Sequence, residues 1–203
     1  MPSLKLGRFS AAGQAFLGRV DGDRMISITA KFPQAGDHME WLIENWQSTR
    51  SVVAALTEPV FALSHVEVLA PIARPGKILG IGLNYKDHIA ETNTEPPNVP
   101  RLFMKLDESL VGAKQPMSKN KLSKEYDFEG ELMVVMGKTA RQVSEKDAMQ
   151  YVAGYTIFND GSIRDFQRRT TDQGKNFYRS SSVGPWMVTM DDVPADDKMD
   201  LIS

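Results

Sequence analysis

The sequence predicts an α+β protein in which β-strands predominate. Short apolar runs separated by Gly, Pro and Asp recur along the 203 residues, a pattern that is typical of strands. Only a few stretches carry the spacing of an amphipathic helix. Apolar residues make up 41% of the chain and charged residues 25%, which is ordinary for a globular protein.

The first part of the chain predicts a small meander followed by a helix. Residues 4–29 alternate short apolar stretches with Gly and Asp turns. Residues 37–56 then carry a helical pattern, and the spacing of Asp37 and Glu40 suits a capping box. Two tryptophans in this helix are expected in the core or in a domain contact.

A domain boundary is expected at Pro71-Ile-Ala-Arg-Pro-Gly76, because residues before proline favour extended backbone over helix. A strand at residues 66–69 precedes it. The prediction is a small α/β N-terminal domain over residues 1–70 and a domain that carries the chemistry over residues 71–203.

The sequence of the second domain predicts mostly strands. Its expected strands are residues 77–85, 102–104, 128–136 and 153–158, and its expected short helices are 87–91 and 144–151. Residues 200–203 resemble the start of one more strand. Because so many strands require further sheet to close on, the sequence is expected to be the front of something longer.

Three carboxylates carry the strongest functional signal. Glu129 and Glu131 stand two apart at the mouth of the apolar run 132–136, so on a strand they share a face about 6.5–7 Å apart. Asp160 follows the next predicted strand. Acids beside a core are unfavourable unless a cation neutralises them. The alternative is an edge strand with a solvated acidic face.

The donor types indicate which cation would fit. The chain has no cysteine, which excludes disulfides and thiolate metal sites. Carboxylates without thiolates predict a site for Mg²⁺ or Mn²⁺ rather than structural zinc.

Two further features are candidates for catalysis. His88 and Glu91 stand three apart, so on a helical turn the carboxylate would orient the imidazole as a general base for water. The alternative is an ordinary surface pair. Lys175 would stabilise an oxyanion beside a metal, or it is a plain surface lysine.

The composition argues against two classes of partner. A net charge of −2 provides no field for nucleic acid or an anionic membrane. No run approaches the roughly 20 apolar residues of a membrane span, and no signal peptide is evident. The expected location is the cytoplasm.

Taken as a set, the motifs of the second domain resemble the fumarylacetoacetate hydrolase family in order and spacing. The resemblance runs from about Pro71 to the C-terminus. The matching motifs are Gly82-Leu-Asn-Tyr-Lys-Asp-His-Ile-Ala-Glu91, Pro97-Asn-Val-Pro-Arg-Leu-Phe-Met-Lys105, Tyr126-Asp-Phe-Glu-Gly-Glu-Leu132, Val152-Ala-Gly-Tyr-Thr-Ile-Phe-Asn-Asp160, Ser162-Ile-Arg-Asp-Phe-Gln167, Gly174-Lys-Asn-Phe177 and Gly184-Pro-Trp-Met-Val188.

The resemblance implies a role for each matching residue. It implies Mg²⁺ or Mn²⁺ binding by Glu129, Glu131 and Asp160, and a water-activating dyad of His88 and Glu91 on a lid. It further implies that Lys175 stabilises an enolate and that Arg164 and Gln167 contact substrate or shape its pocket. Lys105 matches a motif lysine.

The implied fold is the mixed β-roll of that family with a small N-terminal domain. The family fold continues past Ser203 with further strands, including a loop that supplies a threonine to the pocket. The catalytic domain is therefore expected to be incomplete at its C-terminal end. A homodimer is expected by analogy with the family.

The predicted function is metal-dependent hydrolysis of a C–C bond in a 2,4-dioxo acid such as an acylpyruvate. The metal would chelate the oxo-carboxylate end of this small-molecule substrate. One alternative is a decarboxylase or isomerase of 2-oxo diacids, since these reactions share an enolate intermediate. The other is a truncated metal-binding fragment without catalytic activity.

Overall fold

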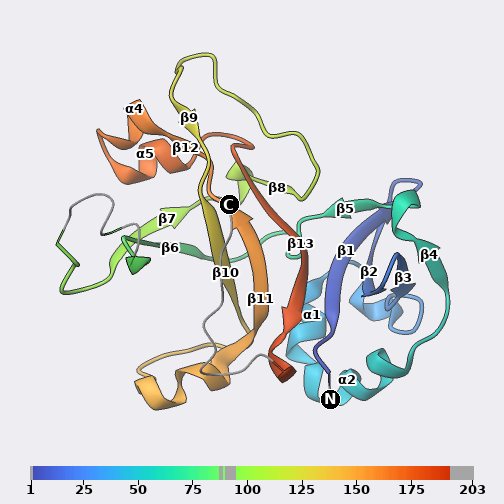
Figure 1. Ribbon diagram of the computed structural model, residues 1–203. Coiled ribbons are helices and arrows are strands. Elements are labelled where there is room, and N and C mark those ends of the chain that lie inside the picture. The colour runs from blue at the N-terminus through green and yellow to red at the C-terminus, as the bar shows by residue number, and fades with distance from the viewer. Residues whose placement is uncertain (1, 87–88, 90–94, 193–203) are drawn as a thin grey trace.

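The computed structural model describes residues 2–86, 89 and 95–192 (Figure 1). Within them, a nine-stranded sheet dominates, and it is accompanied by short helices. Its main path runs through β10 (Gly130–Met136), β11 (Val152–Asn159), β13 (Ser181–Thr189), β1 (Lys5–Ala11), β2 (Gln14–Asp21), β3 (Arg24–Ser27) and β4 (Val60–Ala62), while β5 (Glu67–Leu69) pairs with β1 and β8 (Leu110–Gly112) with β13. The predicted α+β, β-rich class is confirmed.

The predicted N-terminal meander is confirmed as β1, β2 and β3. Two residues, Ala12 and Gly13, join the first pair of strands, and both have positive φ. The second turn places Gly22 at a φ of 62°. Turns with positive φ match the right-handed twist of antiparallel strands, which explains why Gly recurs here.

The predicted helix over residues 37–56 is two helices, α1 (Met39–Glu44) and α2 (Trp46–Ala55), separated at Asn45. The predicted capping box is wrong. His38 occupies the N-cap position without a side-chain hydrogen bond, because the carboxylate of Asp37 instead accepts from Arg8 at 2.7 Å.

The hydrophobic core spans the predicted domain boundary. Leu6, Leu17 and Leu42 are buried together with Val135 and Met187 from the second half of the chain, and both tryptophans of the helical region pack against this cluster. Strand β1 also pairs with β13, with Leu6 opposite Met187 (Figure 1). The division at residue 70 stays a prediction, and the sheet runs across it.

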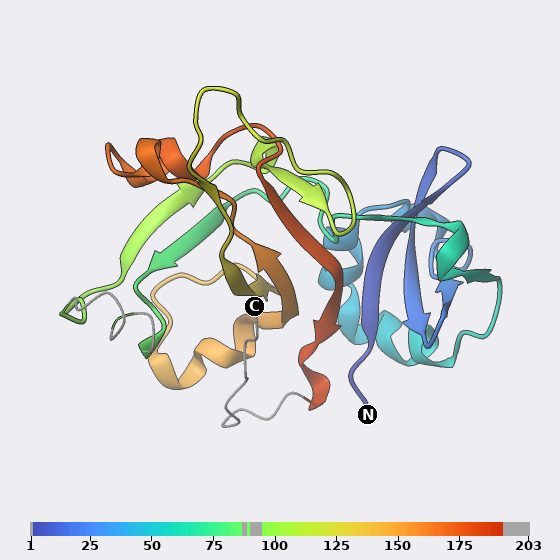
Figure 2. The same cartoon turned by 45° about the horizontal axis from the view of Figure 1, so that its top comes forward.

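Two small sheets support the second half. Strand β6 (Ile78–Gly82) pairs with β7 (Arg101–Lys105), and β9 (Tyr126–Asp127) pairs with β12 (Ser162–Ile163). The short helices α4 (Arg164–Gln167) and α5 (Thr171–Lys175) follow β12 and lie beside the end of β7 (Figure 2). The strands predicted at 77–85, 102–104, 128–136 and 153–158 are therefore present, with shifted ends.

The predicted helix at residues 144–151 is a 3₁₀ helix, Glu145–Tyr151. Ser144 is its N-cap residue, and the Ser144 hydroxyl donates to the side chain of Asp147. The prediction for residues 200–203 lies outside the described residues, and so does that for residues 87–91 except at Ile89. None of the helices in the described part of the chain has the length and apolarity that a membrane crossing requires. The other 3₁₀ helices are Pro33–Ala35, Leu63–His65, Asp107–Ser109 and Met190–Asp192.

Candidate active site

Pairing between β10 and β11 brings the three predicted carboxylates together. Gly130 lies opposite Asn159 and Glu131 opposite Phe158, and the backbone N–H of Asp160 donates to the carbonyl of Glu129 at 2.9 Å. Glu129 and Asp160 are therefore neighbours across two strands. Each of them acts electrostatically on Glu131.

Asp160 is buried and held by Lys105 at the end of β7. The Lys105 ammonium donates to Oδ1 of Asp160 at 2.7 Å and to the hydroxyl of Ser181 at 2.9 Å, and it also contacts the carbonyl of Lys175. Burial lowers the pKa of Lys105, and the nearby Asp160 only partly offsets this effect. The ammonium is fully enclosed by protein partners.

Lys175, at the last position of α5, bridges two of the acids. Its ammonium contacts Oε2 of Glu129 and lies 3.0 Å from Oδ2 of Asp160, and its side chain is only 2% exposed. The sequence builds this placement locally. Thr170 caps α5 by accepting from Gln173 N–H at 3.3 Å.

Glycine allows α5 to approach α4 closely. A Cβ at Gly174 would lie 2.3 Å from Cβ of Gln167, a distance that real side chains do not tolerate. A residue larger than glycine would push α5 outward and move the neighbouring Lys175 away from the acids.

Arg164 begins α4 and connects the acids to the surface. Its Nη1 donates to Oε1 of Glu129 at 2.6 Å and to Oε1 of Gln167 at 2.9 Å. Its Nε and Nη2 donate to Oδ2 of Asp127 at 2.9 and 2.7 Å. Every nitrogen of the guanidinium thus has a protein partner, and the substrate-binding role of Arg164 and Gln167 stays a prediction.

Glu129 and Glu131 differ in their electrostatics. Burial raises the pKa of Glu129, but the hydrogen bond and charge of Lys175, together with Arg164, outweigh it, so the pKa lies below its ordinary value. Burial also raises the pKa of Glu131, and the charges of Glu129 and Asp160 add to this, while a hydrogen bond from Tyr85 opposes it. Glu131 is therefore the acid whose charge the protein compensates least.

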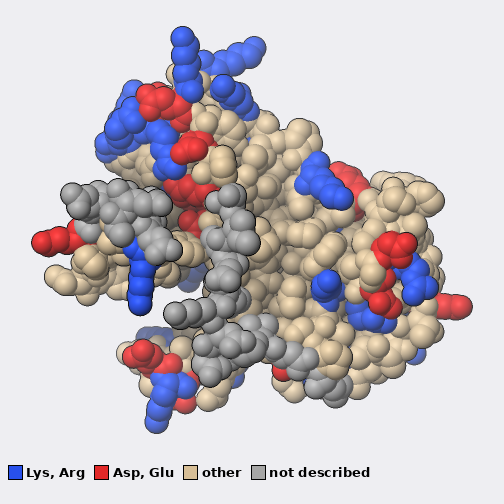
Figure 3. Space-filling view, in the orientation of Figure 1, with Lys and Arg blue, Asp and Glu red and all other residues tan. Residues whose placement is uncertain are grey.

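Basic and acidic side chains also crowd the surface above this cluster, around α4 and α5 (Figure 3). Exposed ion pairs here join Arg164 to Asp127 and Arg168 to Glu125.

The carboxylates are chemically suited to bind a hard divalent cation, although Lys105 and Lys175 neutralise part of their charge. Among the described residues, no three His, Cys, Asp or Glu side chains stand in a geometry ready to hold a metal ion. The ammonium of Lys175 lies between Glu129 and Asp160. The donors are nevertheless oxygen only, and the unfavourable charge of Glu131 would be relieved by a further cation.

The predicted dyad of His88 and Glu91 lies outside the described residues. Tyr85 precedes it and lies at the site, where its hydroxyl accepts from the Leu132 N–H at 3.1 Å. Burial raises the pKa of this phenol.

Sequence reasoning missed Asp127 and Tyr85 and gave Lys105 no definite role. Lys105 had a readable signal, because a lysine that closes the apolar strand Leu102-Phe-Met must find a buried acid or leave the core. Nothing in the spacing distinguished Asp127 from any surface acid.

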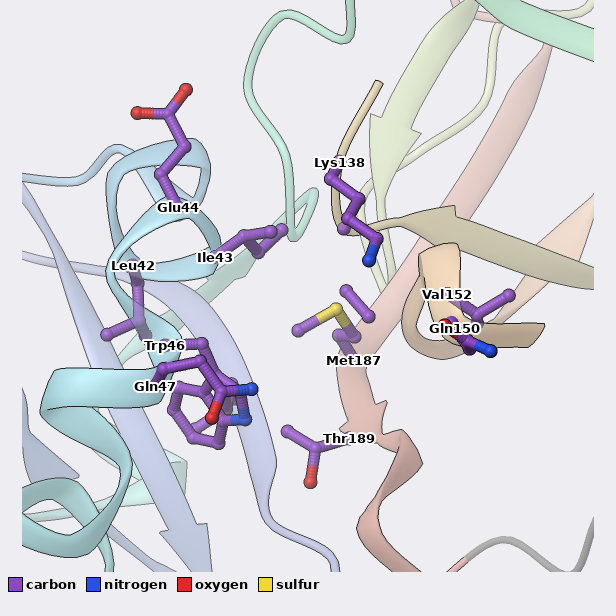
Figure 4. Close-up of a pocket in the computed structure, with 13 residues that line it drawn as sticks. Leu42, Ile43, Glu44, Trp46, Gln47, Lys138, Gln150, Val152, Met187 and Thr189 are labelled. Atoms are coloured by element: carbon purple, nitrogen blue, oxygen red, sulfur yellow. The ribbon is translucent and has the colours of Figure 1, made fainter. Parts of the chain in front are cut away.

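A separate cavity of about 300 Å³ lies away from these acids, between the N-terminal helices and the ends of β11 and β13 (Figure 4). Its described lining is mainly apolar, with Trp46, Ile43 and Met187 facing it. Glu129, Glu131 and Asp160 do not line this cavity, so the candidate active site is defined by the acid cluster and not by the cavity.

Comparison with known proteins identifies related sequences. The family model described as fumarylacetoacetate (FAA) hydrolase, C-terminal, matches residues 77–202. A fumarylacetoacetate hydrolase domain-containing protein 2 homolog of Dictyostelium discoideum is 40% identical over 156 residues, which cover 75% of this chain and 51% of the relative. The mitochondrial oxaloacetate tautomerase FAHD2A of Homo sapiens is 37% identical, over 85% of this chain and 57% of the relative. The chain thus spans little more than half the length of these relatives.

Solved structures agree with this result. A fumarylacetoacetate hydrolase from psychrophilic Exiguobacterium antarcticum superimposes with a TM-score of 0.77 at 30% identity, over 94% of this chain and 68% of that one. Maleylpyruvate hydrolase from Sphingobium sp. SYK-6, in complex with manganese(II) and pyruvate, gives a TM-score of 0.75 at 28% identity, over 95% of this chain and 69% of that one.

Proposed function

This chain belongs to the fumarylacetoacetate hydrolase family, and we propose that it cleaves a C–C bond in a 2,4-dioxo acid with the help of a divalent cation. The observation that carries this proposal is the buried ammonium of Lys175 between Glu129 and Asp160, with Glu131 near enough to interact electrostatically with all three. The related proteins include an oxaloacetate tautomerase, a maleylpyruvate hydrolase and a 5-carboxymethyl-2-hydroxymuconate delta-isomerase, and each of these names refers to an oxygen-rich acid.

Glu129, Glu131 and Asp160 are the proposed ligands for Mg²⁺ or Mn²⁺. When bound, such a cation acts as a Lewis acid toward substrate oxygens and orients them. Support comes from the oxygen-only donor set, from the incompletely compensated charge of Glu131 and from the manganese and pyruvate of the maleylpyruvate hydrolase complex.

In the proposed hydrolysis, a water oxygen bonds to the distal carbonyl carbon of the substrate. The C–C bond between that carbon and the adjacent CH₂ then breaks, and its electron pair forms an enolate that takes up a proton. The products are a carboxylic acid and a 2-oxo acid. Stabilisation of the negative oxygen of such an enolate is assigned, as a prediction, to the buried ammonium of Lys175. Activation of the water is assigned, as a prediction, to His88 and Glu91.

A second candidate is tautomerisation or isomerisation of a 2-oxo diacid such as oxaloacetate. The relative named oxaloacetate tautomerase, which is 37% identical over 180 residues, supports it. Enolate stabilisation by Lys175 serves both reactions, and they differ in whether water or only a proton is delivered. A metal-binding protein without turnover is the remaining alternative.

One assay separates these candidates. The purified chain is treated with EDTA and then supplied with Mg²⁺ or Mn²⁺ together with acylpyruvate or the enol of oxaloacetate. Loss of the substrate absorbance with release of pyruvate indicates hydrolysis, whereas faster decay of the oxaloacetate enol indicates tautomerisation. Glu131→Ala is expected to abolish activity, and Glu145→Ala, at an exposed 3₁₀ position, is the matched control.

Metal-independent turnover, or full activity of Glu131→Ala, would contradict the proposed site. Metal binding without conversion of either substrate would favour the non-catalytic alternative. The expected homodimer is tested separately by light scattering of the same sample.

A further inference from the structure

The pair formed by Asp127 and Arg164 stands just outside the acid cluster. We infer that Asp127 is a positioning residue, which occupies the two-nitrogen edge of Arg164 so that one oxygen of Glu129 stays directed at the acid cluster, where a cation would bind. The inference rests on the proposed metal site and adds a residue to which neither the motif resemblance nor the relatives assign a role.

The hydrogen bonds divide the guanidinium between the two acids. Its Nε–Nη2 edge contacts Oδ2 of Asp127 at 2.9 and 2.7 Å, and only Nη1 reaches Oε1 of Glu129, at 2.6 Å. Oε2 of Glu129 is left to face the interior, where it contacts Lys175. Glu129 thus has one oxygen anchored and one directed at the cluster.

Without Asp127 this division would fail. Arginine binds carboxylates most strongly through two parallel N–H···O bonds. Arg164 freed from Asp127 would turn that edge toward the nearest carboxylate, which is Glu129, and would engage both of its oxygens. Oε2 would then be withdrawn from the interior, and a divalent cation would lose part of a ligand.

The backbone keeps Asp127 where this role requires it. Asp127 pairs with Ser162 in the β9–β12 ladder, and its Oδ1 accepts from the Phe128 N–H at 2.9 Å. The N–H of Arg164 donates to the carbonyl of Glu125 at 2.9 Å. Hydrogen bonds that involve the main chain therefore hold both Asp127 and Arg164 in place, in addition to the ion pair between their side chains.

A matched ion pair one helical turn away serves as the control. Arg168 donates through Nη2 to both oxygens of Glu125, at 2.9 and 2.8 Å. The side chains of this pair are 64% and 47% exposed, compared with 32% and 48% for Arg164 and Asp127. Removing Glu125 deletes the same charge from the same region without involving Glu129.

The experiment measures Mn²⁺ affinity of the full chain by isothermal titration calorimetry. Asp127→Asn is expected to weaken the affinity about 10-fold, the lower end of the loss when a partner of a metal ligand is removed. Asp127→Glu is expected to recover part of it, and Glu125→Gln to stay within about twofold of the wild type. Thermal unfolding of each metal-free variant shows whether the fold is intact.

The outcomes separate the two proposals. If the wild type binds Mn²⁺ and Asp127→Asn binds it equally well, the positioning role alone is overturned. The same holds if Glu125→Gln loses as much Mn²⁺ affinity as Asp127→Asn. Wild type without Mn²⁺ affinity overturns the proposed metal site, and the positioning role with it.

Discussion

The ammonium of Lys105 lies 2.7 Å from Oδ1 of Asp160, and the two side chains are only 1% and 3% exposed. Buried charges of this kind depend on each other, because neither can return to water when its partner is lost. The pair anchors the most deeply buried of the three acids to the end of β7.

Lys105→Met is therefore expected to lower the free energy of unfolding by about 3 kcal/mol, since it removes one of the two cations that neutralise Asp160. Urea unfolding at pH 7 measures this. Lys146→Met, at an exposed position, is the control and should change it by less than about 0.5 kcal/mol. Equal effects of the two substitutions would contradict a structural role for the pair.

Lys175→Met tests the bridging ammonium. It leaves Glu129 and Asp160 close together with less compensation, so the Tm of the metal-free variant should fall. A divalent cation at 100 times its Kd stabilises a binding protein by about 2.7 kcal/mol, or about 5–10 °C in a domain of this size. The Mn²⁺-induced rise should be larger in the variant than in the wild type. An equal or smaller rise would show that ammonium and metal do not share the acids.

Gly161→Ala tests the backbone that places Asp160. A Cβ at this position would lie 1.7 Å from the carbonyl oxygen of Ser180, so a main-chain segment must move. We expect a loss of about 3 kcal/mol in urea unfolding. Gly76→Ala is the matched control, because a Cβ there meets open space, and it should be neutral or slightly stabilising. A tolerated Gly161→Ala would refute the close approach.

The Arg8–Asp37 ion pair predicts a pH dependence. The hydrogen bond from Arg8 holds the pKa of Asp37 below its ordinary value of 3.8. Because the folded state binds its proton more weakly than the unfolded state, the pair stabilises fully above pH 3.8, and this stability is lost as the pH falls through the lowered pKa.

Asp37→Asn is accordingly expected to lower Tm at pH 7 by about 2–8 °C, corresponding to about 1–2 kcal/mol. The difference from wild type should vanish at the acid end of a series from pH 7 to about pH 2. Asp23→Asn, at an exposed turn, should leave Tm unchanged throughout. A Tm difference that is constant with pH would exclude the ion pair as its source.

The sequence by itself determined the strands that flank the acids, whereas the strand Ser181–Thr189 at the centre of the sheet was not predicted. The apolar run after Glu131 and the run before Asp160 were predicted as strands because both are short, contain β-branched residues and are flanked by turn residues. The order and spacing of the motifs indicated the fumarylacetoacetate hydrolase family. Strand patterns and motifs are formed by residues that are close in the sequence, so the sequence alone was sufficient to predict them.

Only the tertiary structure decided which charges meet. Lys105 lies 55 residues from Asp160 and 70 from Lys175 in the sequence, and spacing does not reveal that one ammonium lies between Glu129 and Asp160. For the same reason the capping role predicted for Asp37 failed, since Arg8 lies 29 positions away in sequence but offered a stronger, charged partner. Electrostatic partners are chosen by distance in space after the chain has folded, and that information is absent from any local pattern.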